Sequence, residues 1–461
     1  MNPMVKDMDG MNALKQYTDL YRKHSDLVCR NSCKVMNKFR NAAFKILENG
    51  TLPKKGSENY ETSDLPAIFA PDYGLNLARV NIDVNEKAPF RCGVPEMSTS
   101  LFFMRNDIYS ESPEARSGLP EGLYVGSLKD FCLQYPDKAE KYYGSVADIN
   151  NLPVALNTLM AQDGIAIYVG KGVKVEKTLQ VVNVLENGMP LMAVRRFLIV
   201  AEEDAEVKVL FCDHTQTDKI QFLNLQVIEV VAEKGAKIDV CEMEESSEYT
   251  SRVATMYVRQ EENSNVSATG VTLYNGVTRN EYNCRLEGKA ANLRLAGMAI
   301  EDCERKIDTY SVVEHIAPDC HTDELFKYVA DDESICDFDG LIRVHEGATG
   351  TEAYQNNRNI VGSDKARVYS KPQLEIYDDD VKCSHGSATG SLDELQVFYM
   401  RTRGIPEEEA KLLLKQAFMA DVIDSVEIPG LRDRLRLLVE KRFSGEKRNC
   451  SSCMSGCNVK S

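Results

Sequence analysis

The chain has 461 residues, a formal net charge of −16 and 43% hydrophobic residues. This length allows two or three domains, or one long repeat structure with attachments, and the apolar content suffices for a sizeable core. The acidic balance argues against nucleic acid as a partner, because phosphate binding needs a basic face. No run of about 18 uninterrupted apolar residues occurs, and the N-terminus lacks the apolar segment of a secretory signal. We therefore expect a cytoplasmic protein that does not contact a membrane.

The first part of the chain, residues 1–150, is predicted to be rich in helix. Apolar residues recur at helical intervals from Ala13 to Leu47, and the dipeptide Asn49-Gly50 then provides a stop signal. A further helix is predicted over residues 127–142. Loops rich in proline, glycine and serine separate these segments, so we expect a helix-rich N-terminal region with long connections.

From about Ala161 onwards the chain changes to short β-rich runs separated by polar turns. Alternation of apolar and polar residues is clear in several of them, which is typical of strands. The predicted strands are Ile165–Val169, Val173–Val175, Phe197–Val200, Val207–Phe211, Leu223–Val231 and Ile238–Val240.

A loose repeat runs through this β-rich part. A charged turn, a small residue and an alternating strand recur, and the first strand residues are separated by 34, 31, 28, 27, 43 and 32 residues. These first residues are Val173, Val207, Ile238, Val266, Leu293, Cys336 and Val368. A period of roughly 30 residues made of strands and turns predicts a β-solenoid. The alternative is a sandwich, which would need hairpin turns every ~8–12 residues. We assign the solenoid core to residues 151–388.

After Gly390 the pattern becomes helical again, and we assign residues 389–445 to a C-terminal helical region. A first helix is predicted to stop at Gly404, a second runs from Pro406 to about Val426, and a third spans residues 431–443. The second helix is apolar on most of its sides, so more than one surface must cover it. Either a partner protein or this chain's own solenoid can supply the second surface.

Motifs for nucleotide chemistry and hydrolysis are absent from the sequence. There is no G-x-x-x-x-G-K-[ST] phosphate loop, no H-E-x-x-H and no G-x-S-x-G. The nearest glycine cluster, at residues 169–172, lacks the spacing that cradles phosphates. We therefore expect a non-catalytic subunit, and any ATP-driven step must belong to a partner.

Cys383 and His385 form one candidate ligand pair. On an extended strand, residues i and i+2 point the same way, so a thiolate and an imidazole would lie side by side. Such a pair suits zinc, Cu(I) or an iron–sulfur intermediate. Two ligands do not complete a tetrahedral site, so the others would come from elsewhere, such as another subunit. The alternative is a purely structural role.

The C-terminal tail, residues 446–461, is predicted to be a flexible segment that contains clustered thiols. Cys450, Cys453 and Cys457 lie within a stretch rich in serine and glycine. Three thiols at this spacing could bind a metal or carry sulfur, so a metal-storing protein is one alternative function. The other interpretation is a tail whose thiols have no role.

A run of carboxylates, Asp378-Asp379-Asp380, permits a second alternative function. Paired carboxylates on a β-solenoid would suit a carbohydrate-active enzyme. Such an enzyme would need an acidic cleft and usually export, and neither is evident in the sequence. A solvated turn is the simpler interpretation of this run.

Three long segments resemble a known family. They are residues 155–184, residues 321–370 and residues 371–405, the last of which reads KPQLEIYDDDVKCSHGSATGSLDELQVFYMRTRGI. They resemble the SufB/SufD family of the SUF iron–sulfur cluster assembly machinery, and the residues around Gln355 and Cys383 resemble its SufD branch. The sequence departs from the family where an EEWKYT signature is replaced by residues 58–62, and its cysteine tail has no recognised counterpart.

The resemblance implies a right-handed parallel β-helix between helical N- and C-terminal regions, and a scaffold role in cluster assembly. The implied partners are a SufB-like sister subunit and a SufC-like ABC-type ATPase, with a homodimer as the possibility in isolation. No cofactor would be permanently bound, and a transient cluster or iron would sit at the subunit interface, on this side next to Cys383 and His385. The C-terminal helices would bind the ATPase, through Leu395, Phe398, Tyr399, Leu413 and Phe418.

Overall fold

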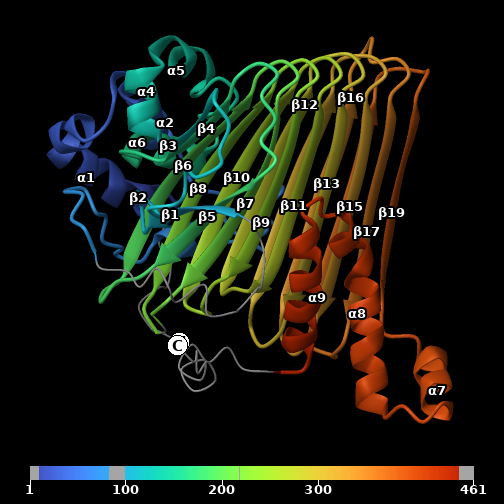
Figure 1. The fold of residues 1–461 in the computed structure, drawn as a ribbon. Helices are drawn as coiled ribbons and strands as arrows, with labels where there is room; N and C mark the ends of the chain where they lie inside the picture. Colours follow the sequence, from blue (N-terminus) through green and yellow to red (C-terminus); the bar gives the residue numbers. More distant parts are fainter. Residues whose placement is uncertain (1–9, 83–98, 218, 446–461) are drawn as a thin grey trace, which may run out of the picture.

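The computed structural model describes residues 10–82, 99–217 and 219–445. Its centre is a parallel β-solenoid of about eight turns with two sheets, and helices lie at both ends of the chain (Figure 1). One sheet has the strand order β19-β17-β15-β13-β11-β9-β7-β5-β1-β2, and the other has the order β18-β16-β14-β12-β10-β8-β6-β4-β3. The predicted solenoid between helical regions is therefore confirmed.

The first sheet, called the odd sheet below, consists of β1 (Thr99–Arg105), β2 (Ile108–Glu111), β5 (Thr178–Leu185), β7 (Glu206–Thr215), β9 (Lys237–Glu245), β11 (Asn265–Tyr274), β13 (Asn292–Glu301), β15 (His321–Ala330), β17 (Glu352–Val361) and β19 (Lys382–Gly390). The second, called the even sheet, consists of β3 (Leu123–Ser127), β4 (Ile165–Val169), β6 (Leu191–Ala201), β8 (Phe222–Ala232), β10 (Thr250–Gln260), β12 (Val277–Leu286), β14 (Lys306–His315), β16 (Ile335–Val344) and β18 (Arg367–Ile376).

The main core lies inside the solenoid, between the two sheets. Alternation along each strand turns every second side chain inwards, where apolar residues of successive coils stack. Aromatic rings meet across this interior, as Phe197 and Phe211 do at a centroid distance of 4.8 Å. Phe326 on β15 and Phe338 on β16 repeat the contact in a later coil, also at 4.8 Å. The solenoid is thus a filled structure.

The repeat seen in the sequence mixes the two sheets. Val207 and Leu293 lie near the starts of odd strands, whereas Cys336 and Val368 lie near the starts of even strands. The odd-sheet neighbour of Leu293 is Thr322, and the sequence pattern missed it, which explains the 43-residue gap. Strands of both sheets start after similar charged turns, so the pattern cannot tell them apart.

One predicted strand, residues 173–175, is wrong. This segment forms only an isolated bridge between Lys174 and Glu206. The preceding Gly172 has a positive φ of 69°, a conformation that glycine adopts without strain. The chain therefore turns here and does not run straight into a ladder.

The N-terminal helices cover the outer face of the even sheet at its first coils. They are α1 (Gly10–Arg30), α2 (Lys34–Asn49), α3 (Leu65–Phe69), α4 (Leu128–Gln134), α5 (Pro136–Tyr142) and α6 (Leu152–Met160). The helical pattern predicted over residues 13–47 is interrupted at residues 31–33, and α2 ends at Asn49 as predicted. The helix predicted over residues 127–142 is two helices, because Pro136 opens a new one.

A buried ion pair joins this helical layer to the sheet. Arg196 on β6 and Glu229 on β8 both have side chains at most 1% exposed, and Arg196 Nη2 lies 2.6 Å from Glu229 Oε1. The same oxygen accepts a hydrogen bond of 3.1 Å from the backbone N–H of Gly144, in the loop after α5. A buried charge pair of this kind requires full hydrogen bonding, so it fixes the helices in one position.

The segment that departs from the expected family signature also packs on the even sheet. The ring of Tyr60 lies 4.3 Å from the guanidinium of Arg279, and its hydroxyl donates to Glu281 Oε1 at 3.1 Å. Thr62 Oγ1 donates to Asp337 Oδ2 at 2.8 Å. Tyrosine therefore anchors the segment by stacking on a buried arginine.

The C-terminal helices are α7 (Glu394–Thr402), α8 (Glu407–Ser425) and α9 (Pro429–Phe443), close to their predicted positions. α8 and α9 pack on the outer face of the odd sheet, where Met419 and Leu435 join a separate apolar cluster. Arg442 holds α9 by donating to the carbonyl oxygens of Leu273 at 2.7 Å and Ile300 at 3.0 Å. Of the helices that the structure describes, none is long and apolar enough to cross a membrane.

Candidate functional site

The last coil of the solenoid consists of β18 and β19. Each of these strands is the last strand of its sheet and has an unpaired edge. β18 pairs with β16 and β19 pairs with β17, and no other described strand is hydrogen-bonded to either. The two strands are ten and nine residues long, and most of their residues are exposed or half-buried. Unpaired edges of this length are templates for pairing with another chain.

The inward face of this coil is an incomplete core. Val368, Leu374 and Cys383 contact the apolar core on one side only and remain half-buried. Ser370 and Ser387 link the two strands through a hydrogen bond of 2.8 Å between their hydroxyl groups. In every earlier coil such residues are covered by the next turn, so this layer lacks the turn that would complete it.

Cys383 and His385 both belong to this layer. Cys383 is the register neighbour of Ala353, and His385 is the register neighbour of Gln355, which is fully buried. Because residues two apart on a strand share a face, the thiol and the imidazole lie on the same inward face, as predicted. Cys383 is half-buried and His385 is exposed. The structure thus places the pair at the open end of the solenoid.

Cys383 and His385 together provide only part of the ligands that a metal ion needs. Burial raises the pKa of the Cys383 thiol, so a soft metal or a sulfur donor must displace its proton before the sulfur can bind. Among the residues that the structure describes, no group of three or more His, Cys, Asp or Glu could hold a metal ion. A tetrahedral site needs four donors, so two must come from outside this set.

A buried carboxyl group lies behind the pair. Glu324, on β15, is fully buried and accepts a hydrogen bond of 2.5 Å from Gln355 Nε2. Burial raises the pKa of Glu324 to about 7. The layer under His385 is therefore polar and titrates near neutral pH. Sequence patterns did not single out Glu324, since an acidic residue in an alternating strand resembles a solvent-facing one.

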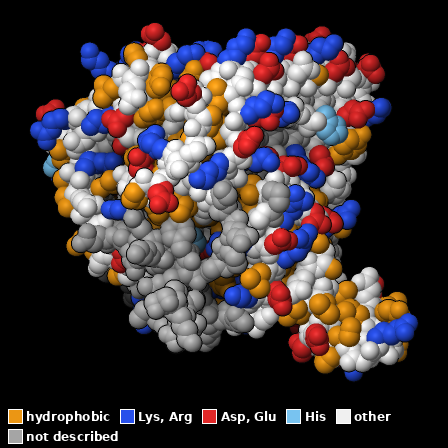
Figure 2. All heavy atoms as spheres, in the orientation of Figure 1, with side chains coloured by type: hydrophobic (Ala, Val, Ile, Leu, Met, Phe, Trp, Pro, Cys, Tyr) orange, Lys and Arg blue, Asp and Glu red, His pale blue; other side chains and the backbone are white. Residues whose placement is uncertain are grey.

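The helix α7 follows β19 directly and projects from the body of the molecule (Figure 1). Its apolar residues Leu395, Phe398 and Tyr399 are 77%, 63% and 59% exposed. Figure 2 shows hydrophobic side chains gathered on this projecting part. Large apolar side chains clustered on a surface mark an interaction site, so the exposure of these three predicted residues fits a partner-binding role.

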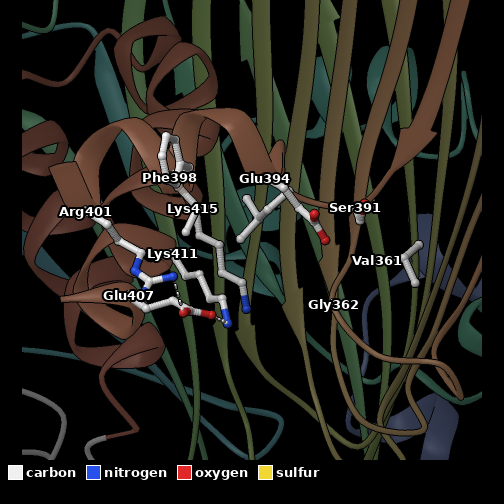
Figure 3. A pocket seen from close by; sticks show the side chains of 11 residues that line it. Val361, Gly362, Ser391, Glu394, Phe398, Arg401, Glu407, Lys411 and Lys415 are labelled. Atoms are coloured by element: carbon white, nitrogen blue, oxygen red, sulfur yellow. Dashed lines mark ion pairs between the residues drawn. The ribbon is translucent and has the colours of Figure 1, made fainter. Parts of the chain in front are cut away.

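A cleft of about 590 Å³ separates α7 from α8 and the end of β17 (Figure 3). Glu407 bridges the two helices, because its carboxylate lies 3.1 Å from Arg401 Nη1 and 2.9 Å from Lys411 Nζ. Lys415 lines the same cleft and pairs with Asp331 Oδ2 at 2.7 Å. Three basic residues of the cleft, Arg401, Lys411 and Lys415, are therefore already paired with carboxylates. The cleft was not predicted from the sequence.

The remaining two residues predicted to bind a partner lie on α8 and differ from those on α7. Leu413 is 37% exposed. Phe418 is half-buried against the odd-sheet cluster, and Lys327 Nζ lies 4.8 Å from its ring centroid. Lys327 also donates to the Phe418 carbonyl at 2.8 Å. The second half of α8 thus packs on this chain's own solenoid, and Phe418 is mainly an internal contact.

The carboxylate run and the cysteine tail are the two remaining features predicted from the sequence. The Asp378 carboxylate accepts hydrogen bonds of 3.1 Å from the backbone N–H groups of Gly347 and Asp380, which is the arrangement of a surface turn. This geometry supports the solvated-turn interpretation of the carboxylate run. The tail cysteines Cys450, Cys453 and Cys457 lie outside the described residues.

Comparison with known protein families gives a match over most of the chain. The model described as SUF system FeS cluster assembly, SufBD core domain, matches residues 183–418, and the SufBD protein N-terminal region matches residues 11–181. The chain belongs to the SufBD family. The core model spans the end of β5 to α8, so the SufBD core corresponds to most of the solenoid and the start of its C-terminal helices.

Relatives within the SufBD family carry names from iron–sulfur cluster assembly. An iron–sulfur cluster assembly SufBD family protein of Synechocystis is 26% identical over 416 residues, which are 88% of this chain and 91% of that protein. The iron–sulfur cluster assembly protein SufD of Escherichia coli is 34% identical over 172 residues, 37% of this chain and 41% of that protein. A SufBD family protein of Mycobacterium leprae is 34% identical over 191 residues, 40% of this chain and 49% of that protein.

Proposed function

We propose that this SufBD protein is a SufD-type scaffold subunit that builds iron–sulfur clusters together with a SufB-like sister subunit. The observation that carries the proposal is the open last coil, which presents two unpaired strand edges and the pair Cys383 and His385 on one face. A sister solenoid docked there would extend both sheets and cover the half-buried Val368 and Leu374. The cluster site would then lie at the interface.

In this complex the iron and the nascent cluster are cargo. Cys383 supplies a soft thiolate after losing its proton, and His385 supplies an imidazole nitrogen. The sister subunit supplies the remaining donors, because two ligands from this chain leave a tetrahedral iron incomplete. A site shared between two chains can release its cargo when the interface moves, which suits transient assembly and iron acquisition better than storage.

The energy source in this proposal is a SufC-like ABC-type ATPase, acting in the cytoplasm. The sequence has no phosphate-binding loop, so this chain would be the non-catalytic part of the assembly. The exposed residues Leu395, Phe398 and Tyr399 on α7 offer the ATPase an apolar contact surface directly after β19. A movement of α7 would reach the cluster site through a connection of only three residues, Ser391 to Asp393.

The test is anaerobic cluster assembly on the complex, after co-expression with the sister subunit and the ATPase. Cys383→Ala and His385→Ala should each leave the complex intact and lower the iron and sulfide bound per complex. Ser384→Ala is the matched control, since it lies between them on the outward face of β19 and should assemble clusters normally. Unchanged cluster yield in both site variants would contradict the role of the pair, and failure of the chain to join either partner would contradict the scaffold function.

A further inference from the structure

Gln355, on β17, lies in the layer directly beneath the open coil. Its side chain is fully buried, and its Nε2 donates a hydrogen bond of 2.5 Å to Glu324 Oε2 on the neighbouring strand β15. The other end of the amide, Gln355 Oε1, is buried and has no hydrogen-bond partner among the described residues. Buried polar atoms are almost always paired, so this acceptor points to a donor that reaches it from outside its own layer.

The position of this amide is fixed from the opposite sheet. Gly340, on β16, faces Gln355 across the interior, and a Cβ atom at Gly340 would collide with the Gln355 amide nitrogen. The glycine therefore leaves the space that the amide occupies. Glu324 holds the nitrogen end of the amide, so Oε1 stays available to accept a hydrogen bond from the next coil.

The last coil places one suitable donor above this oxygen. His385 is the register neighbour of Gln355, about 4.8 Å along the ladder and on the same inward face. Pro372, on the facing strand β18, has no donor in its side chain, and the Ser387 hydroxyl is already bonded to that of Ser370 at 2.8 Å. The side chain of His385 is exposed, so it can change rotamer freely.

We propose that Gln355 and Glu324 are positioning residues for His385. When the sister subunit covers the last coil, the imidazole turns onto the buried amide and donates one ring N–H to Gln355 Oε1. A neutral imidazole has one N–H and one free lone pair, so this bond fixes the tautomer and presents the other ring nitrogen to the metal. The inference rests on the scaffold function proposed above and adds two residues to its site.

The support is specific to the imidazole. The register neighbour of Cys383 is Ala353, which has no polar side chain to orient the thiol. Removing the hydrogen-bond partner of a metal-binding histidine lowers metal affinity by about 10- to 100-fold. We therefore expect loss of the Gln355 amide to weaken metal binding through His385 alone.

The experiment measures Co(II) binding to the anaerobic metal-free complex of this chain with the sister subunit and the ATPase, followed by the cobalt–thiolate absorption. Gln355→Met should weaken binding by about 10- to 100-fold. The same substitution in a His385→Ala background should cause no further loss, because a residue that acts through His385 has no effect once the imidazole is gone. A general structural defect would weaken binding in both backgrounds.

Two variants of Glu324 and one control complete the set. Glu324→Gln keeps an acceptor for Gln355 Nε2 and should bind Co(II) like the parent, whereas Glu324→Leu should behave like Gln355→Met. Gln226→Met is the matched control, because Gln226 Nε2 donates to Glu242 Oε1 at 2.8 Å inside an earlier, covered coil. It should leave Co(II) affinity unchanged. Size-exclusion chromatography of each variant checks assembly, and Gln355→Asn, which keeps a shorter amide, replaces Gln355→Met if the latter does not assemble.

The outcomes separate this inference from the function on which it rests. If His385→Ala weakens Co(II) binding but Gln355→Met does not, or if the two losses add, the positioning role is wrong and the scaffold function stands. If Cys383→Ala and His385→Ala both bind Co(II) like the parent, the proposed cluster site is wrong and the positioning role falls with it.

Discussion

The two ends of the solenoid consist of the same kind of coil, but the sheets terminate differently at each end. At the first end, the antiparallel strands β2 and β3 terminate the two sheets, and the N-terminal helices cover the outer face of the even sheet. At the last end, β18 and β19 keep their free edges, and the core layer beneath them is half-exposed. The contrast shows that helices of this chain cover the sheet at the first end, whereas the last end leaves two strand edges open to a second chain.

The largest effect is expected from breaking the first end. Glu229→Ala removes the carboxylate that pairs with Arg196 and leaves that guanidinium buried without its charge partner. Loss of one member of a buried pair costs about 3–5 kcal/mol. We expect the free energy of unfolding, measured by urea denaturation, to fall by that amount.

The matched control for Glu229 is an exposed pair on the same solenoid. Lys171 and Glu203 lie 2.5 Å apart, with side chains 66% and 43% exposed. Glu203→Ala should change the free energy of unfolding by less than about 1 kcal/mol. Equal effects of the two variants would show that the ion pair does not fix the helical layer.

The next largest effect is expected at the last end of the solenoid, and it should change binding to the sister subunit and not the stability of this chain. Leu374→Asp places a charge on the half-buried inward face of β18, where a sister subunit would bury it. Burying an unpaired charge at an interface costs roughly 2–5 kcal/mol, so the Kd for the sister subunit should rise by about 30-fold or more. Size-exclusion chromatography of the mixed subunits would report the loss.

The control for Leu374 is Tyr369→Asp, on the same strand but facing outwards and 47% exposed. It should leave association largely unchanged, and both variants should keep a melting temperature close to that of the parent. If Tyr369→Asp and Leu374→Asp weaken association equally, the outer face and not the open core is the contact surface.

A smaller effect is expected in the pH dependence of stability beneath the open coil. Burial raises the pKa of Glu324 to about 7, above the value of ~4.3 in an unfolded chain. Between these two pH values the folded protein holds a proton that the unfolded chain has lost, so stability falls as the pH rises through this window. Glu324→Gln keeps an acceptor for Gln355 and removes the titration.

We therefore expect Glu324→Gln to gain up to about 3 kcal/mol relative to the parent at pH 8, and little at pH 4. Chemical denaturation at both pH values would measure the difference. The exposed Glu346→Gln serves as control and should leave the slope unchanged. Burial also raises the pKa values of Glu244, Glu301 and Asp337, so the slope should fall only in part, and a slope equal to that of the parent would show that Glu324 does not titrate in this window.

The sequence predicted the larger features of the fold because they rest on local patterns. Alternation and turn residues predicted the solenoid, and the stop signals at Asn49 and Gly404 lie close to the ends of α2 and α7. The pattern could not separate the two sheets, since strands around Leu293 and Cys336 follow the same kind of turn. Each strand of a solenoid pairs with a strand about one coil away in the sequence, so a local sequence pattern does not identify its partner.

The candidate site was predictable only in part, for a related reason. The spacing of Cys383 and His385 identified two neighbours on one strand, but the lack of a covering coil is a property of the whole sheet. Nothing local distinguishes Phe418, which packs inwards, from Phe398, which is 63% exposed.

The smallest effect is expected at α7, the helix that follows the open end of the solenoid. Phe398→Ala removes an exposed ring, so the stability of this chain should change by less than about 0.5 kcal/mol. If the ATPase buries that ring, its binding should weaken by about 1.5–3 kcal/mol, roughly 10- to 100-fold in Kd. Leu437→Ala on α9, 47% exposed, is the matched control and should bind normally. Equal binding of the Phe398 variant and the parent, measured by calorimetry, would place the ATPase contact away from α7.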